Sequence, residues 1–201
     1  MTDLISELTR ALHPLDTPPA CRGANREYPV GLIGDAPRRD AAVLVGVRDV
    51  PDPRVIFTLR CDDLVHHAGQ VSFPGGSAEA GDLGAVATAL RESHEEIALD
   101  PKAVEPLGFL DALETISGFR VTPVVARLAH DAVLVPQPGE VAQIFEVPLT
   151  YLLEPSNVRE FDYRSHGLHR KAYEYVGVAP RIWGATARML VNLMRRMGRM
   201  R

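Results

Sequence analysis

Three glutamates stand close together in the stretch ALRESHEEI, which covers residues 89–97. Glu92, Glu95 and Glu96 all fall within this stretch. In an α-helix, with about 100° per residue, Glu96 lies roughly 40° and Glu95 roughly 60° from Glu92, so the three form one stripe. Like charges at this spacing slightly destabilise a helix. The stripe is either a solvated face or a set of the oxygen ligands that hard cations such as Mg²⁺ prefer.

A helix around these glutamates needs an apolar face with which to pack. Four apolar residues fall between roughly 120° and 180° from Glu92 on the helical wheel; they are Leu83, Val86, Leu90 and Ile97. We therefore expect a helix within residues 83–99 that buries this face and presents the carboxylates on the opposite one.

The chain immediately before this helix is rich in glycine. The stretch GQVSFPGGSAEAGD, residues 69–82, places Gly75 and Gly76 after the end of an expected strand. Two residues without a Cβ allow backbone N–H groups to approach an anion closely. A glycine loop beside an acidic stripe would place phosphate and metal side by side. Asp82, shortly before the helix, is expected to cap its first turn.

The segment from Gly76 to Leu99 resembles the Nudix box, in which a glycine and a spaced acid precede Arg-Glu-hydrophobe-x-Glu-Glu-x-Gly-hydrophobe. The dipeptides Arg91-Glu92 and Glu95-Glu96 match this pattern in register, as does Leu99. Ser93 stands in place of the usual hydrophobe, and Ala98 in place of the usual glycine.

The spacing from Gly76 to Arg91, with Asp82 as the acid, is longer than in the general pattern and is similar to that of one subfamily, the coenzyme A pyrophosphatases. Their upstream motif is Leu-Leu-Thr-x-Arg-Ser/Ala, followed by Arg, by Gly and by Phe-Pro-Gly-Gly. The residues that match it are Thr58, Arg60, Gly69, Phe73, Pro74, Gly75 and Gly76. Cys61 replaces Ser/Ala, and Val65 replaces the second arginine. The stretches TISGFRVTPVV, PGEVAQIFEVPL and IWGATA extend the resemblance from about Asp40 to the end of the chain.

This resemblance implies a Nudix-type α/β/α sandwich that hydrolyses a diphosphate linked to a nucleoside, with Mg²⁺ or Mn²⁺ as cofactor. Glu92 and Glu96 are expected as metal ligands, and Glu95 as a third ligand or as the holder of metal-bound water. Arg91 is expected to orient a carboxylate of the box; an ordinary surface ion pair is equally consistent with the sequence.

Residues outside the box are expected to complete the site. Glu140, in PQPGEV before a strand, matches a position from which Nudix enzymes often supply a base or a further metal ligand, or it is an ordinary loop carboxylate. His66 and His67 either contact phosphate or act as acid–base groups, or they are simply exposed. Substrate contacts are expected from Arg60, Gly69, Gln70, Gly75 and Gly76, with Arg60 on a phosphate.

The subfamily resemblance favours coenzyme A or its derivatives as the substrate, with 3′,5′-ADP and 4′-phosphopantetheine as products. Val65 cannot make the charged contact of an arginine, which leaves ADP-ribose or a dinucleotide open as substrate. A Nudix fold that binds a ligand without turnover is the third alternative, although the glutamates and the arginine of the box are intact.

The composition is that of an ordinary globular domain. Of the 201 residues, 46% are hydrophobic and 24% are charged, and the formal net charge is -4. This balance gives no electrostatic reason to expect nucleic acid or a membrane as partner. Cys21 and Cys61 are the only cysteines, so no disulfide framework is expected. The N-terminal MTDLISELTR carries Asp3 and no long apolar run, so we expect no signal peptide and a cytoplasmic protein.

Apolar runs bounded by proline, glycine and aspartate predict the strands. They cover residues 41–47, 54–60, 106–113, 119–128 and 141–149, and residues 158–178 alternate as a hairpin around His166-Gly167. Helices are expected at residues 4–12 and in the tail from Pro180 to Met200, with Pro180 in the first turn. Strands and helices interleave without a regular βαβ repeat, so the predicted fold class is α+β, a mixed β-sheet flanked by helices.

Two parts of the chain are distinguished by composition. Residues 1–39 are predicted to be an N-terminal helix and an irregular arm rich in proline and glycine, which wraps the domain or reaches a partner subunit. Residues 40–201 are predicted to be one domain with a closing helix at its end. The arm and the apolar strands are compatible with a homodimer.

Overall fold

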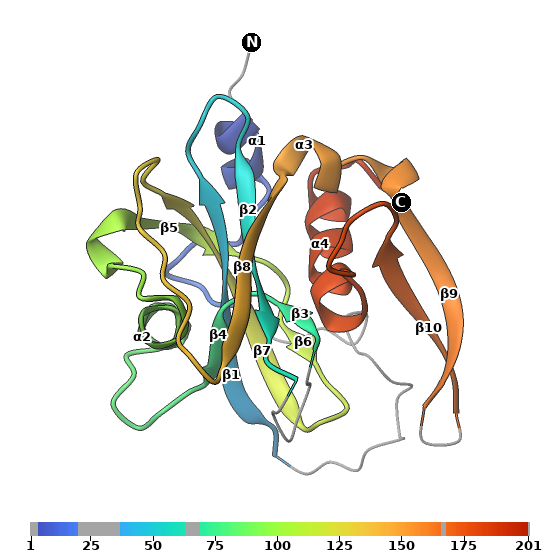
Figure 1. Ribbon diagram of the computed structural model, residues 1–201, viewed down its shortest axis with the longest axis horizontal. Helices are drawn as coiled ribbons and strands as arrows, with labels where there is room; N and C mark the ends of the chain where they lie inside the picture. Colours follow the sequence, from blue (N-terminus) through green and yellow to red (C-terminus); the bar gives the residue numbers. More distant parts are fainter. Residues whose placement is uncertain (1–3, 20–36, 63–68, 166–167, 201) are drawn as a thin grey trace.

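The framework of the molecule is a mixed β-sheet with helices on both faces (Figure 1). The structure is a computed structural model that describes residues 4–19, 37–62, 69–165 and 168–200. The strands of the main sheet are β1 (Arg39–Arg48), β2 (Arg54–Arg60), β3 (Val71–Ser72), β4 (Gly75–Ser77), β5 (Val104–Phe109), β6 (Leu113–Glu114), β7 (Phe119–Leu128) and β8 (Val141–Pro148). The helices are α1 (Leu4–Arg10), α2 (Ala85–Ile97), α3 (Leu149–Leu152) and α4 (Gly184–Arg196), with 3₁₀ turns η1 (Pro101–Ala103) and η2 (Pro155–Asn157).

β1 and β7 form the centre of the sheet and run parallel. They pair over their full length, from Arg39 with Phe119 to Arg48 with Leu128. β4 and β2 pair with β1, β5 and β6 pair with β7, and β2 also pairs with β3 and β8, all of them antiparallel. One parallel pair among antiparallel neighbours confirms the predicted mixed sheet.

Alternate residues of β1 supply the two cores, because successive side chains of a strand point to opposite faces. Val45 and Val47 belong to the core under α1, α3 and α4, whereas Ala42 and Leu44 belong to the core under α2. Figure 1 shows α2 on one side of the sheet and α4 on the other. The α/β/α sandwich expected from the sequence is therefore confirmed.

A separate two-stranded sheet follows the main one. β9 (Val158–Ser165) and β10 (Leu168–Tyr175) pair antiparallel, from Val158 with Tyr175 to Ser165 with Leu168, and α4 lies beside β10 (Figure 1). The predicted hairpin is confirmed, while its turn, His166-Gly167, lies outside the described residues.

The closing helix is confirmed as α4, but it begins at Gly184, so the expectation that Pro180 lies in its first turn is wrong. The chain before α4 is extended instead. The N–H of Tyr175 donates to the carbonyl of Ile182 over 2.9 Å, and Glu174 and Trp183 form an antiparallel bridge. These backbone hydrogen bonds to β10 hold the segment out of a helical conformation.

The N-terminal helix is confirmed as α1. Its Leu8 is fully buried in the core under α4, so this helix packs on the same body as the sheet. Residues 20–36, which make up most of the expected arm and include Cys21, lie outside the described residues. The boundary between residues 39 and 40 stays a prediction.

Candidate active site

Helix α2 carries the three glutamates, but the face it buries is not the one expected. Leu83 precedes the helix and is 95% exposed, although Ile97 is buried as expected. The residues that α2 buries are Thr88, Ala89, Ser93, Glu96 and Ile97. The prediction that the carboxylates lie opposite the packed face is therefore wrong for Glu96. The small side chains of Ala89 and Ser93 let the helix lie close against β1 and β4 on this face.

Glu96 is almost fully buried, with 4% of its surface exposed. Its Oε2 accepts a hydrogen bond from the N–H of Gly75 at 3.1 Å, and its Oε1 lies 3.5 Å from Nη1 of Arg60. Burial raises the pKa of Glu96 to about 7, although both contacts lower it, and the nearby charges of Glu92 and Glu140 add to the rise. Glu96 is therefore a carboxylate whose charge its neighbours compensate only in part.

Glu92 lies directly against strand β4. A Cβ on Gly76 would come within 2.5 Å of the Glu92 carboxyl carbon and within 2.6 Å of both its oxygens. Burial raises the pKa of Glu92, against the hydrogen bond from Arg91, which lowers it. Gly76 is thus the residue that leaves room for this carboxylate.

Gly75 brings β4 close to β1. Its φ is +148°, and a Cβ there would lie 2.3 Å from the carbonyl oxygen of Ala42 and 2.5 Å from Cα of Val43. Glycine is therefore required at this position. The anion that its N–H contacts in the structure is the carboxylate of Glu96, and the expected contacts of Gly75 and Gly76 with substrate stay predictions.

Arg91 donates all five of its N–H bonds to the protein. Nε and Nη2 donate to the carboxylate of Asp82, and Nη2 also donates to the carbonyl of Ser77. Nη1 donates to Glu92 at 3.0 Å and to Glu95 at 3.1 Å. The expected pairing of Arg91 with carboxylates of the box is observed, and it fixes the rotamer of Glu92 and holds the exposed Glu95 beside it.

Asp82 does not cap α2, so that expectation is wrong. The N-cap residue is Gly84, and no side chain caps the helix. Asp82 instead accepts hydrogen bonds from the Thr88 hydroxyl and from the N–H of Glu79, each at 2.9 Å, and from Arg91. The Arg91 hydrogen bonds hold the pKa of Asp82 well below its usual range. The sequence reading missed Thr88, although its place one turn before Arg91 on the same helix face was the available signal.

The ends of β2 and β3 bring further predicted residues to the cluster. The N–H of Arg60, at the end of β2, donates to the carbonyl of Gln70 at 3.0 Å. Gly69 has a φ of +65°, and a Cβ there would lie 2.8 Å from an Asp62 carboxylate oxygen. Arg60 and Gln70 therefore meet beside the β2–β3 pairing, and Arg60 also contacts Glu96. Their contacts with substrate stay predictions.

Glu140 reaches the same region from the start of β8. The N–H of Cys61 donates to its carbonyl oxygen at 3.0 Å, and its charge acts on Glu96. Its side chain is exposed, so it is accessible to a substrate or a water molecule. Val65, His66 and His67 lie outside the described residues.

The two departures from the box pattern are accommodated locally. Ser93 is fully buried, and its hydroxyl donates to the carbonyl of Ala89 at 2.6 Å, so no polar atom is left without a partner. Ala98 ends α2 in the left-handed conformation, with φ 51° and ψ 26°. An alanine is strained in this conformation, which explains why glycine is usual there.

The chemistry of the donors fits a hard divalent cation. Within the described residues, no three His, Cys, Asp or Glu side chains already converge as a complete ligand set. The carboxylates of Glu92, Glu95 and Glu96 are nevertheless oxygen donors of the kind that Mg²⁺ takes. Burial raises the pKa of Glu92 and Glu96, so both need more positive charge than Arg60 and Arg91 provide. A divalent cation would supply that charge.

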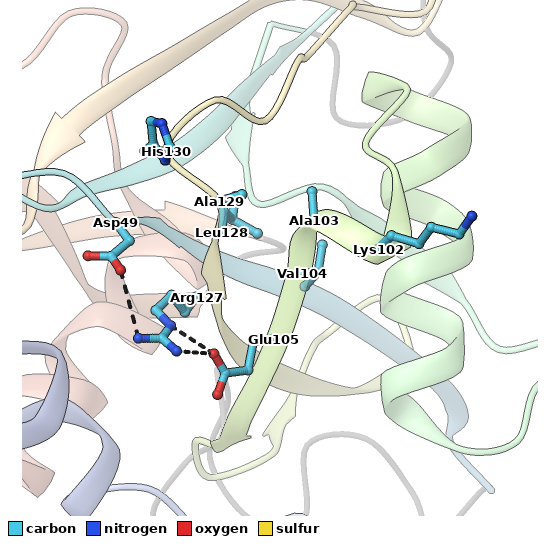
Figure 2. Close-up of a pocket in the computed structure, with 9 residues that line it drawn as sticks. All are labelled: Asp49, Lys102, Ala103, Val104, Glu105, Arg127, Leu128, Ala129 and His130. Carbon is cyan, nitrogen blue, oxygen red and sulfur yellow. Dashed lines mark hydrogen bonds and ion pairs between the residues drawn. The ribbon is translucent and has the colours of Figure 1, made fainter.

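A pocket of about 260 Å³ lies at the opposite end of β1 (Figure 2). In its lining Arg127 lies between Asp49 and Glu105 and pairs with both. The other residues that line it are Lys102, Ala103, Val104, Leu128, Ala129 and His130. It contains none of the predicted site residues.

Comparisons with known proteins identify relatives of this chain. The NUDIX domain family model matches residues 37–166. A protein of Pectobacterium atrosepticum described as "Uncharacterized Nudix hydrolase NudL" is 39% identical over 156 residues, which cover 78% of this chain and 81% of the relative. A protein of Cronobacter sakazakii with the same description is 37% identical over 161 residues, which cover 80% of this chain and 84% of the relative. A crystal structure of a Nudix hydrolase from M. smegmatis, RenU, aligns with a TM-score of 0.48 and 23% identity, over 56% of this chain and 72% of that one.

The family match and the NudL relatives, together with the glutamate cluster, show that the chain belongs to the Nudix family. It is a pyrophosphohydrolase for a substrate with a nucleoside diphosphate linkage. Nudix hydrolases generally need a divalent cation, which the carboxylate cluster fits. No helix in the described part of the chain has the length and apolar character needed to cross a membrane.

Proposed function

We propose that the protein hydrolyses coenzyme A or its derivatives to 3′,5′-ADP and 4′-phosphopantetheine, with Mg²⁺ or Mn²⁺ as cofactor. The observation that carries the proposal is the meeting of two segments at one carboxylate. Glu96 of the box contacts both Arg60 and Gly75. These two residues belong to the upstream segment that resembles the coenzyme A pyrophosphatase motif, which supports one site built from both.

Glu92 and Glu96 would hold the cation, with Glu95 as a third ligand or as the holder of its water. When bound, a divalent cation neutralises diphosphate charge and lowers the pKa of bound water. Arg91 keeps Glu92 and Glu95 in place through its hydrogen bonds to both.

Residues from other strands act on the substrate. Arg60 donates to a phosphate oxygen of the substrate, where a guanidinium forms strong charge-assisted hydrogen bonds. Glu140 takes the proton of the attacking water, and its exposed side chain at the start of β8 supports this role. Gly75 and Gly76 keep the carboxylates of Glu96 and Glu92 close to β4.

Product analysis tests the proposal. The protein is incubated with coenzyme A, and separately with ADP-ribose, in Mg²⁺ and in Mn²⁺. We expect 3′,5′-ADP and 4′-phosphopantetheine from coenzyme A. In Glu96→Gln the turnover should fall by roughly 100-fold or more, because a metal ligand has lost its charge. Cleavage of ADP-ribose alone would keep the chemistry but replace the substrate, and turnover of neither would refute both substrates.

A matched pair of glycine variants tests the site without removing a carboxylate. In Gly76→Ala the new Cβ displaces the Glu92 carboxylate, so turnover should fall by roughly 10-fold while the fold is kept. Gly81→Ala is the control, because a Cβ there meets nothing within 4 Å. Equal activity of the two variants would contradict the assignment of Glu92 as a ligand.

A further inference from the structure

The two arginines at the carboxylate cluster are bound very differently. Arg91 donates all five N–H bonds to oxygen atoms. Arg60 has its Nη1 3.5 Å from Glu96, at the limit of a hydrogen bond. Its Nε is buried and has no hydrogen-bond partner in the part of the chain that the structure describes. Arg91 is therefore fixed, whereas Arg60 has unused hydrogen-bonding capacity.

Glu96, the carboxylate that Arg60 faces, is also incompletely satisfied. It is 4% exposed and receives one hydrogen bond of ordinary length, from Gly75. The charges that act on it are Arg60, Glu92 and Glu140, of which two are negative. A buried carboxylate with one hydrogen bond of ordinary length and a buried N–H without a partner are both costly to keep. Each would be better matched by a ligand, Glu96 by a cation and Arg60 by an anion.

The position of Arg60 allows it to change partners. It is the last residue of β2, where the register against β8 shifts between Leu59 and Arg60. Its side chain contacts the buried Glu96 and is still 28% exposed, so it lies between the buried carboxylate and solvent. A rotation of this side chain is enough to move the charge from one to the other.

We propose that Arg60 exchanges partners during the reaction. In the free enzyme it is the counter-charge of Glu96; when a divalent cation takes that place, Arg60 turns to a phosphate oxygen of the substrate. The inference rests on the proposed function, which supplies the cation and the diphosphate. Arg60 therefore competes with the metal for Glu96. Metal binding also frees Arg60 and so increases its contribution to binding the diphosphate. Binding of metal and substrate is thus coupled.

Metal titration tests the competition. Mg²⁺ is titrated by calorimetry into metal-free wild type, Arg60→Met and Arg54→Met. Arg54 is the matched control because it lies on the same strand and pairs with a carboxylate, Glu146, at 3.7 Å. We expect Arg60→Met to bind Mg²⁺ roughly 3- to 10-fold more tightly than wild type, since no side-chain cation competes, and Arg54→Met to stay within about twofold. Should Arg60→Met fail to fold, Arg60→Gln serves with the same expectation.

A second titration separates an exchange of partners from a fixed charge. The probe is α,β-methylene-ADP, a nucleoside diphosphate that is not hydrolysed between its phosphorus atoms. If Arg60 is released by the metal, Arg60→Met loses more probe affinity in Mg²⁺ than in EDTA. If Arg60 is instead a fixed charge, Arg60→Met loses probe affinity by the same factor in Mg²⁺ and in EDTA.

The outcomes separate this inference from the proposed function. Unchanged or weaker Mg²⁺ binding by Arg60→Met, or equal losses of probe affinity, would overturn the exchange while coenzyme A hydrolysis by the wild type still supports the function. A wild type that neither binds Mg²⁺ nor turns over coenzyme A would overturn the function, and the exchange with it.

Discussion

Individual side chains of this site differ in how well their charge is matched. Arg91 and Asp82 satisfy each other, and their hydrogen bonds raise the pKa of the one and lower that of the other. Glu96 has no such partner, because burial removes water and Arg60 lies 3.5 Å away. Arg91 and Asp82, which build the site, are thus well satisfied, whereas Glu96 and Arg60 are not.

The unmatched charge of Glu96 makes the stability of the metal-free protein depend on pH. The pKa of Glu96 is about 7 in the folded protein and 4.5 in the unfolded chain. Between these values the folded state keeps a proton that the unfolded state has lost, so the free energy of unfolding falls as pH rises, by up to about 3 kcal/mol. Below pH 4.5 this contribution is fully present, and above pH 7 it is lost.

Urea denaturation in EDTA at pH 5 and pH 8 measures this effect. We expect the wild type to lose stability between these values and Glu96→Gln, which has no carboxyl at position 96, to lose less; Glu92, whose pKa burial also raises, contributes in both proteins. The lowered pKa values of Asp82 and Glu174 act at lower pH and do not overlap this window. If the free energy of unfolding changed equally with pH in the wild type and in Glu96→Gln, Glu96 would not be the source of the pH dependence.

Among the secondary-structure elements, α2 has one face that both packs against the sheet and carries Glu96, a predicted metal ligand. The spacing of the glutamates predicted the helix and the stripe, because helical periodicity is local. It did not predict that Glu96 is buried, since the packed face uses Ala89 and Ser93 rather than large apolar residues. Likewise, β7 was predicted with the correct ends, whereas the start of α4 was missed because hydrogen bonds to β10 decide it. Sequence patterns thus locate elements, while contacts between distant segments decide their ends and buried faces.

The left-handed end of α2 gives a prediction about this element. In Ala98→Gly the strain of an L-residue at φ 51°, about 1–2 kcal/mol, is removed. The greater freedom of glycine in the unfolded chain offsets about 0.4–1 kcal/mol of this. We expect a net gain of about 0.5–1 kcal/mol in the free energy of unfolding, or roughly 1–4 °C in Tm, measured by calorimetry. Ala87→Gly, within α2, should instead lower Tm, and a lower Tm for Ala98→Gly would contradict the strain.

Across the whole molecule, Asp111 ties segments outside the family match to the central sheet. His13 Nε2 lies 2.6 Å from its Oδ1, and Arg196 donates to the same oxygen at 2.9 Å. Asn192, also in α4, donates to Oδ2 at 2.8 Å. The chain before β1, the connection between β5 and β6, and α4 therefore meet at one carboxylate, which the sequence alone did not single out.

Loss of this carboxylate charge should weaken the molecule without affecting its chemistry. We expect Asp111→Asn to lower the free energy of unfolding by about 1–3 kcal/mol, because the partly buried guanidinium of Arg196 loses its counter-charge. Turnover at 20 °C should stay near that of the wild type, since neither His13 nor Arg196 contacts the glutamate cluster. Urea denaturation and activity are measured together.

The control for this variant is Asp40→Asn. Asp40 pairs with Arg120 at the surface, and its side chain is 57% exposed, so the cost should be below about 0.5 kcal/mol. A similar loss of unfolding free energy in both variants would show that Asp111 contributes no more than an ordinary surface ion pair does.

The parallel pairing of β1 with β7 also determines how much of the chain must be synthesised before the main sheet can close. Every residue of β1 pairs with a residue of β7, and β2 to β6 and α2 lie between these two strands in the sequence. Closure of so long a loop is slow compared with the formation of a local hairpin. β8 must then join β2 before Cys61 and Glu140 can meet. The glutamates of the box are thus synthesised before β7 and β8, and the main sheet around them can close only after both of these strands have been made.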